Sequence, residues 1–200
     1  MPNTFILVVA VLAAALASFL AYVATRPGRF RIVRSAFIAA PPELVFARLE
    51  DFRNWRAWSP WEKKDPALTR TYRGPESGPG AVYEWSGNAA VGQGRMEITE
   101  VTPPMLLRIR LDFFKPFKAS NVAEFTLTRR QGGTNLSWAM EGPSRFVSKL
   151  MGVLMNMDRI VGADFEAGLN NLKALAERAA LEQAPPIDFQ PGGGSDGSGA

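Results

Sequence analysis

The side chains that most often do chemistry in proteins are scarce in this sequence. Its 200 residues include no cysteine and no histidine. This composition excludes thiolate nucleophiles, Ser-His-Asp triads and zinc sites of the usual Cys/His kind. A metal site made of carboxylates alone would need a cluster of acidic residues, and the sequence contains no such cluster. We therefore expect neither a metal nor a cofactor.

Acid–base catalysis would need a positioned proton donor or acceptor. By residue type, the candidates are Asp65, Glu84, Glu97, Asp112, Glu124, Glu141 and Arg110. Most of them alternate with apolar residues along predicted strands and so share one polar face, where charges are usually solvated. We interpret them as surface charges. Tyr72, Tyr83 and Asn121 are candidate hydrogen-bond donors inside a pocket, but no catalytic spacing pairs them.

The elements that must hold these residues are mainly strands. In residues 106–113, for example, Leu107, Ile109 and Leu111 alternate with Arg108 and Arg110. Clean alternation of this kind predicts an antiparallel sheet with one covered face and one wet face. Gly and Pro turn signals separate the runs. The predicted strands are 30–39, 68–72, 81–86, 91–101, 106–113, 118–128 and 134–141.

Two helices are predicted to flank the strands. Pro42 opens a short one, in which apolar residues recur at helical spacing until about residues 51–54. A long helix runs from about Arg145 to about Glu182, with a break expected near residues 156–162. We expect this last element to cover the sheet.

Three of the five tryptophans lie within seven residues, at Trp55, Trp58 and Trp61. The neighbouring Pro60 predicts a loop or a short broken helix. Each indole buries a large area and needs a partner for its N–H group. Two interpretations stay open: the cluster plugs one end of the sheet, or it forms the mouth of a ligand site.

The order of elements, together with five local motifs, resembles one known superfamily. The motifs span residues 40–51, 55–61, 92–98, 132–138 and 164–173. Over about residues 30–177 they resemble the START-like (SRPBCC) superfamily of polyketide cyclase/dehydrase and lipid-transport proteins. The resemblance implies an α+β helix-grip fold, in which a curved antiparallel sheet of about seven strands wraps around a long C-terminal helix. It specifies no reaction, because one fold hosts many activities.

The same resemblance implies an apolar cavity between the sheet and the long helix. Such sites are mostly apolar, with a few polar groups that orient the ligand. For each candidate, ordinary core packing is the competing interpretation. The candidate ligand-binding residues are Trp58, Trp61, Tyr83, Trp85, Phe113, Phe117, Trp138, Met140, Met151 and Met155.

The N-terminus predicts a membrane anchor. The first 25 residues carry no charge, and the 21 residues from Thr4 to Ala24 are almost entirely apolar. As a helix they would span roughly 32 Å, against about 30 Å for the hydrocarbon core of a bilayer. Four arginines follow within nine positions, beginning at Arg26. A cleaved secretory signal is the alternative, but the N-terminus lacks the basic residues that such signals carry.

Charge and length complete the predicted organisation. The arginines lie only after the span, so the positive-inside rule predicts a cytoplasmic domain on a single-pass anchor, with an extracytoplasmic domain as the alternative. The net charge of +4 is mild, and no long basic run suggests nucleic acid. We expect an anchor over 1–25, one domain over 26–184 and a disordered Gly/Pro-rich tail over 185–200.

These observations leave three functional hypotheses. The first is a membrane-anchored, non-enzymatic module that binds a hydrophobic small molecule or a lipid. The second, by resemblance only, is a cyclase or dehydratase of polyketide-like substrates, which requires an inward-facing ionisable group with a shifted pKa. The third is a protein-binding adaptor at the membrane, with a solid interior and protein partners that the sequence does not identify.

Overall fold

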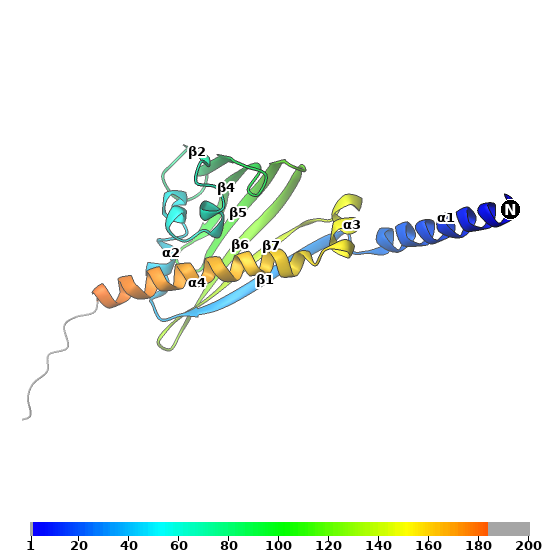
Figure 1. Ribbon diagram of the computed structural model, residues 1–200. Coiled ribbons are helices and arrows are strands. Elements are labelled where there is room, and N and C mark those ends of the chain that lie inside the picture. The colour runs from blue at the N-terminus through cyan, green and yellow to red at the C-terminus, as the bar shows by residue number, and fades with distance from the viewer. Residues whose placement is uncertain (1, 184–200) are drawn as a thin grey trace, which may run out of the picture.

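The computed structural model describes residues 2–183, which form one sheet and several helices (Figure 1). The predicted tail over 185–200 lies outside the described residues. The element bounds are α1 (Pro2–Thr25), β1 (Arg29–Ile38), α2 (Pro42–Phe46), the 3₁₀ helices η1 (Phe52–Ala57) and η2 (Pro60–Lys63), β2 (Thr69–Arg73), β3 (Val82–Ser86), β4 (Gln93–Thr102), β5 (Leu106–Lys115), β6 (Ala119–Arg130), β7 (Gly133–Pro143), α3 (Phe146–Leu154) and α4 (Met157–Gln183).

The seven strands form one antiparallel sheet in the order β1-β7-β6-β5-β4-β3-β2. The predicted α+β helix-grip fold is confirmed, and each observed strand overlaps a predicted one. Alternation sets the register: Ile109 on β5 pairs with Ile98 on β4 and with Ala123 on β6, so apolar side chains gather on the inner face.

Helix α4 covers that inner face. Phe165, Leu169 and Leu172 are buried at helical spacing against the sheet. Gly168 lies at a close approach of α4 to the sheet, because a Cβ there would lie 2.9 Å from the Trp138 ring. The predicted long helix therefore does cover the sheet, but only through its second part.

The first part of the predicted long helix is a separate element. Helix α3 ends at Leu154, and α4 begins at Met157. The break thus falls just before the predicted 156–162 interval. None of the residues of α3 is buried, so this helix does not pack on the sheet, contrary to expectation. The first predicted helix also stops early, because α2 ends at Phe46 and the chain continues through turns into η1.

The two ends of the sheet carry different connections. The α1 end is where β1 begins and β7 ends, at the pair Arg29 and Pro143, and it also carries the β3–β4 loop and the β5–β6 turn. The opposite end carries the β4–β5 turn, the β6–β7 turn and the C-terminal part of α4. Helix α1 leaves the domain at the α1 end, with α3 beside its base (Figure 1).

The α1 helix itself is 24 residues long and almost wholly exposed. In the described chain, residues 3–25 form the one helix long and apolar enough to cross a membrane. A signal sequence at an N-terminus has the same length and composition.

Candidate ligand cavity

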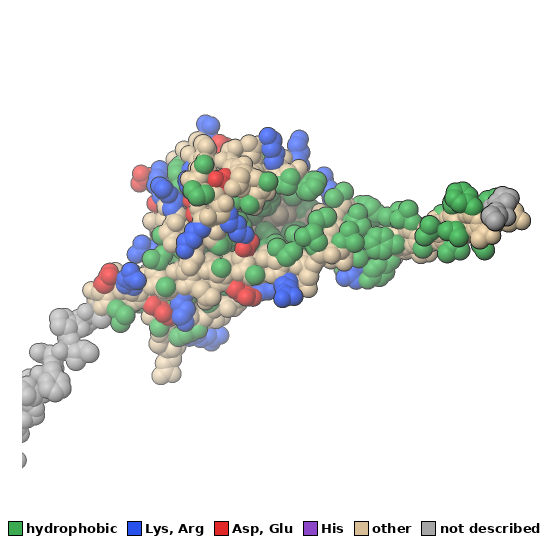
Figure 2. Space-filling view, viewed as in Figure 1, with side chains coloured by type: hydrophobic (Ala, Val, Ile, Leu, Met, Phe, Trp, Pro, Cys, Tyr) green, Lys and Arg blue, Asp and Glu red, His purple; other side chains and the backbone are tan. Residues whose placement is uncertain are grey.

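A cavity of about 270 Å³ lies between α4 and the inner face of the sheet. Its walls come from η1, η2, the inner face of β3 to β7, the β3–β4 loop at the α1 end of the sheet, and the first turns of α4. Figure 2 shows a hollow at this end, bordered by hydrophobic side chains that continue toward α1. Its lining residues are Trp55, Ser59, Trp61, Glu62, Leu68, Tyr83, Trp85, Ala90, Val91, Met96, Leu111, Phe113, Ala123, Trp138, Met140, Val161, Asp164 and Phe165.

Six of the ten candidate ligand-binding residues lie in this wall. They have in common an inward position on the sheet or in η2, and they are Trp61, Tyr83, Trp85, Phe113, Trp138 and Met140. The indole of Trp85 occupies the space beside Gly94 on the paired strand, where any Cβ would overlap it. A small residue on β4 thus makes room for a large one on β3. Binding by these residues stays a prediction.

The other four candidates lie outside the wall. Trp58 is fully buried in the solid part of the core. Phe117 lies in the β5–β6 turn and is 66% exposed. Met151 and Met155 belong to α3 and the break after it, away from the sheet interior. Both methionines continue the apolar pattern of the predicted long helix, but the segment before the break at residues 155–156 does not pack on the sheet.

The tryptophan cluster contributes to both the solid core and the cavity wall, while its role as the mouth of a ligand site stays a prediction. The indole of Trp58 packs 4.7 Å from that of Trp55 between ring centroids and donates its Nε1–H group to the Arg48 carbonyl at 3.2 Å. The Trp55 indole donates to the Leu49 carbonyl at 2.9 Å. Trp58 therefore plugs the core, Trp55 lies at the boundary, and Trp61 forms part of the cavity wall.

One ionic cluster stands in the apolar wall. The side chain of Glu62 is only 8% exposed and forms an ion pair with Arg70, whose Nε lies 2.7 Å from Oε2. The Tyr83 hydroxyl donates to Glu62 Oε1 at 3.0 Å. Burial and the nearby Glu62 carboxylate together raise the pKa of Tyr83, so this phenol is neutral. The hydrogen bond to Glu62 likewise raises the pKa of Arg70.

The charges of Glu62 and Arg70 are paired within the cluster. Glu62 accepts hydrogen bonds from both partners, so the carboxylate is already neutralised and oriented before any ligand binds. Such an arrangement can position a polar group of a ligand. Proton transfer would first require Glu62 to give up its bonds to Arg70.

Two further polar groups border the cavity. Asp164 of α4 accepts hydrogen bonds from the Lys64 ammonium at 2.7 Å, and this pair links α4 to the end of η2. Within the described residues, the buried indole nitrogen of Trp138 has no hydrogen-bond acceptor. An unmet buried donor costs about 1–3 kcal/mol. A ligand with an acceptor group could recover part of that cost.

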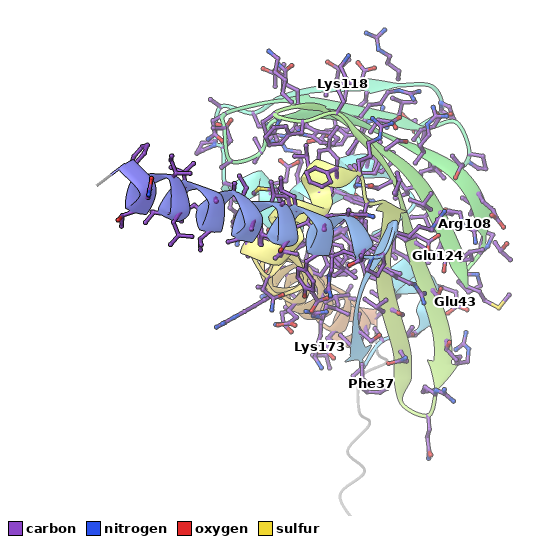
Figure 3. All side chains as sticks on the ribbon, turned by 90° about the vertical axis from the view of Figure 1, so that its right-hand side faces the viewer. Phe37, Glu43, Arg108, Lys118, Glu124 and Lys173 are labelled. Atoms are coloured by element: carbon purple, nitrogen blue, oxygen red, sulfur yellow. The ribbon has the colours of Figure 1, made fainter. Side chains whose placement is uncertain are left out.

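The carboxylates considered as acid–base candidates mostly lie on the outer face. Arg108 pairs with Glu124, 2.7 Å apart, and both side chains point away from the sheet interior (Figure 3). Glu97 pairs with Arg110 at 2.5 Å and with Arg95 at 2.8 Å. The prediction of surface charges therefore holds for these strand residues.

Asp65 is the exception among those candidates, because it is only 6% exposed. Its carboxylate accepts from the Asn88 backbone N–H at 2.6 Å and from the Ala67 backbone N–H at 3.0 Å. These bonds fix the segment after η2 to the β3–β4 loop. Its role is structural, since both oxygens are used in holding backbone.

Sequence reasoning missed several wall residues, of which Glu62 matters most. It follows Trp61 directly, in a segment whose charged neighbours Lys63 and Lys64 suggest a solvated turn. Its partner Arg70 is eight positions away on a short strand. The buried ion pair depends on how η2 folds back on β2, and no spacing rule encodes that.

The family model for polyketide cyclase/dehydrase and lipid transport matches residues 29–177. This match covers well over half of the 200 residues, so the chain belongs to that family. The region matched contains all seven strands and most of α4, but not α1. No curated protein matches the chain.

Solved structures share the fold at low sequence identity. A protein from Chromobacterium violaceum is 18% identical, with a TM-score of 0.53, over 76% of this chain and 98% of its own. A protein from Mycobacterium smegmatis is 21% identical, with a TM-score of 0.53, over 74% and 92%. The di-domain ARO/CYC StfQ of the steffimycin biosynthetic pathway is 13% identical, with a TM-score of 0.54, over 76% and 52%. Similarity at this level establishes the fold and no activity.

Proposed function

We propose that this chain is a membrane-anchored module that binds a hydrophobic small molecule or a lipid without chemically changing it. The observation that carries the proposal is the cavity of about 270 Å³, whose wall is almost entirely aromatic and aliphatic. Ligand pockets generally have this character, with a few polar groups that fix orientation. Each methylene group that a ligand buries there contributes about 0.8 kcal/mol.

The anchor supports the proposal by location. Helix α1 has the length and composition of a bilayer span, and Arg26, Arg29 and Arg31 follow it directly. An anchored domain would meet apolar ligands at high local concentration. By the positive-inside rule we infer a cytoplasmic domain. Protease added to intact spheroplasts should then leave the domain uncut, and digestion from outside would refute this topology.

The domain boundaries belong to the same proposal. The family match begins at residue 29, just after α1, which supports an anchor over 1–25 followed by one domain over 26–184. The disordered tail over 185–200 is inferred from composition alone.

A cyclase or dehydratase is the second candidate, because Glu62 and Tyr83 give the cavity an inward-facing ionic cluster. It is the weaker candidate, since Arg70 already holds the Glu62 carboxylate. The variant Glu62→Gln separates the two functions: a catalyst would lose turnover while still binding substrate, whereas a carrier would show no turnover to lose. The adaptor hypothesis required a solid interior, and the cavity argues against it.

The binding proposal is tested by filling the cavity from α4. Val161 lines the cavity, whereas Ala163, two residues later on the same helix, is exposed. The full chain in nanodiscs is irradiated with a photoreactive fatty acid, and the labelled peptides are identified by mass spectrometry. Wild type and Ala163→Trp should be labelled on cavity-lining strands. Val161→Trp should show roughly tenfold less labelling there. Equal labelling of all three proteins would refute binding in the cavity.

A further inference from the structure

Exposed apolar side chains are concentrated at one end of the domain. Among the described residues after α1, eleven large hydrophobic side chains are exposed. Three of them, Phe37, Met105 and Leu181, lie elsewhere, on β1, the β4–β5 turn and the C-terminal part of α4. The remaining eight all lie at the α1 end, and they are Phe114, Phe117, Phe146, Val147, Leu154, Met155, Met157 and Ile160.

Helix α3 supplies the centre of this surface. Helix α3 has no buried residue, even though it is rich in apolar side chains. Its residues Phe146, Val147 and Leu154 are 46%, 55% and 64% exposed. An apolar helix with no partner in the domain is unusual for a soluble surface. Helix α3 packs instead beside the last turn of α1, where the Lys149 ammonium donates to the Ala24 carbonyl at 2.9 Å. It therefore lies at the depth where the span would leave the hydrocarbon.

The charges around α3 match an anionic surface. Arg26 and Arg31 follow the span, Arg145 and Lys149 flank the start of α3, and Lys118 stands in the β5–β6 turn (Figure 3). Basic residues near a membrane surface are attracted to anionic lipids.

Acidic groups at the same end are engaged within the protein. Glu141 pairs with Arg29 at 3.4 Å, and Asp158 pairs with Arg34 at 3.0 Å. Asp112 accepts a hydrogen bond from the Ser120 hydroxyl at 2.6 Å. The net character of this end is thus apolar and basic, as for helices that lie in the membrane interface.

From these observations we infer that α3 and the β5–β6 turn contact the anionic surface of the bilayer that α1 spans, so that the cavity opens against lipid. We call these two segments the membrane rim. Part of the cavity wall, including Trp85, Val91 and Phe113, lies at this same end, and in Figure 2 the hollow adjoins the apolar surface that leads to α1. A ligand could pass between bilayer and cavity without crossing water. This inference rests on the proposed anchoring by α1.

The test uses single cysteines in the full chain, which has none of its own. Val147→Cys and Phe117→Cys report on the two parts of the membrane rim, and Met105→Cys is the control at the opposite end, with similar exposure of the native residues at 55%, 66% and 56%. Each is labelled with a polarity-sensitive fluorophore and placed in nanodiscs of phosphatidylcholine and phosphatidylglycerol. Lipids with a quencher near the headgroup then measure contact with the bilayer.

Labels on the membrane rim should lose at least about half of their emission and shift to the blue, while the Met105→Cys label should change little. Omitting phosphatidylglycerol should reduce the quenching at Val147→Cys. Rim labels that behave like the control would overturn the inference.

A label at Leu12→Cys, in the middle of α1, is measured with lipids that carry the quencher deep in the acyl chain, and it separates the two failures. If it is quenched by lipids while both rim labels are not, the anchor stands and the inference fails alone. If the Leu12→Cys label is also unquenched, α1 does not span the bilayer and both fail. Circular dichroism of each labelled protein verifies the fold.

Discussion

The two ends of the sheet use the same residue types in opposite ways. Toward the opposite end, Trp58, Phe125 and Leu136 are almost completely buried, and ring edges meet ring faces. At the α1 end, Trp61, Trp85 and Phe113 surround a cavity instead. The aromatic composition is similar, but the core is densely packed toward the opposite end and encloses a cavity toward the α1 end. We call these two parts the solid half and the hollow half.

Hydrogen bonding of the indole N–H groups varies among the buried tryptophans, and Trp85 in the hollow half donates to the Val91 carbonyl at 3.0 Å. In the solid half, the indole nitrogens of Trp55 and Trp58 both donate to backbone carbonyls of the segment after α2. In the hollow half, the Trp138 indole nitrogen lacks an acceptor within the described chain, and Glu62 brings a charge into the wall. The hollow half therefore contains polar groups, the Trp138 indole N–H and the Glu62 carboxylate, to which a ligand can bind.

The largest expected effect comes from emptying the solid half. Trp58→Ala removes a fully buried indole and its hydrogen bond, and should lower the free energy of unfolding by about 3–5 kcal/mol. Denaturant unfolding of the full chain in detergent measures this change. A loss below about 1 kcal/mol would mean that this half is not solid.

The next effect tests how tightly α4 closes on the sheet. A Cβ on residue 168 would lie 2.9 Å from the Trp138 ring and 3.2 Å from Pro60, so Gly168→Ala should cost about 1–3 kcal/mol of stability. Gly152→Ala in α3 is the matched control, because nothing lies within 4 Å of its Cβ. The control should gain up to about 1 kcal/mol from helix propensity. Equal changes in the two variants would contradict the packing described for α4.

A wall residue should affect binding more than stability. Trp61→Ala removes an indole that lies 5.8 Å from the Trp138 ring between centroids, at the cavity wall. We expect roughly tenfold weaker photolabelling, equivalent to about 1.4 kcal/mol, with a smaller loss of stability than in Trp58→Ala. If Trp61→Ala and Trp58→Ala lose stability equally and labelling of Trp61→Ala is unchanged, the division into a solid half and a hollow half is wrong.

The ionic cluster predicts a stability change in alkali. Because the folded-state pKa of Tyr83 is raised, its contribution is fully present below the ordinary tyrosine pKa of about 10 and is lost as pH rises through the folded pKa. Unfolding midpoints measured from pH 8 to pH 12 should therefore fall above about pH 10. Tyr83→Phe should flatten that fall and cost about 1 kcal/mol at neutral pH. An unchanged alkaline profile would show that burial and the nearby Glu62 carboxylate do not raise the pKa of Tyr83.

The smallest effect is expected at the ion pairs that join Arg34 of β1 to Asp158 and Glu166 of α4. Arg34 reaches across Gly162 to Asp158 and Glu166, and its hydrogen bonds lower the pKa of Asp158. The resulting stabilisation is present above the ordinary aspartate pKa of about 4 and is lost as pH falls through the lower folded value. Asp158→Asn should therefore change the unfolding midpoint slightly at pH 7 and not at pH 2. A larger difference in unfolding midpoint at pH 2 than at pH 7 would contradict the lowered pKa of Asp158.

The sheet could be predicted from the sequence because its signals are local. Alternation in 106–113 and the Gly132-Gly133 turn specify strands and their connection without knowledge of the remaining chain. The membrane-span candidate is likewise a property of one continuous segment. The helical spacing of apolar residues predicted the long helix that covers the sheet, and the family resemblance implied that the sheet wraps around it.

The site could be predicted only in part, because it depends on distant contacts. Strand residues such as Tyr83 and Trp138 were identified because alternation places them on the inner face. Met151 and Met155 continue the apolar pattern of α4. The sequence predicted a break near residues 156–162, but not that the segment before the break leaves the sheet. Glu62 resembles a solvated charge until η2 folds against β2. Placement of α3 beside α1 joins segments more than a hundred residues apart.

The account depends most on whether the hollow half holds a ligand. Native mass spectrometry of the full chain, released from nanodiscs and followed by solvent extraction, measures this directly. The account predicts a discrete added mass on the wild type and on Ala163→Trp, absent from Val161→Trp, and an extract that contains a hydrophobic small molecule or a lipid. A bare protein mass for the wild type, with no uptake from a panel of lipids and polyketide-like compounds, would contradict it.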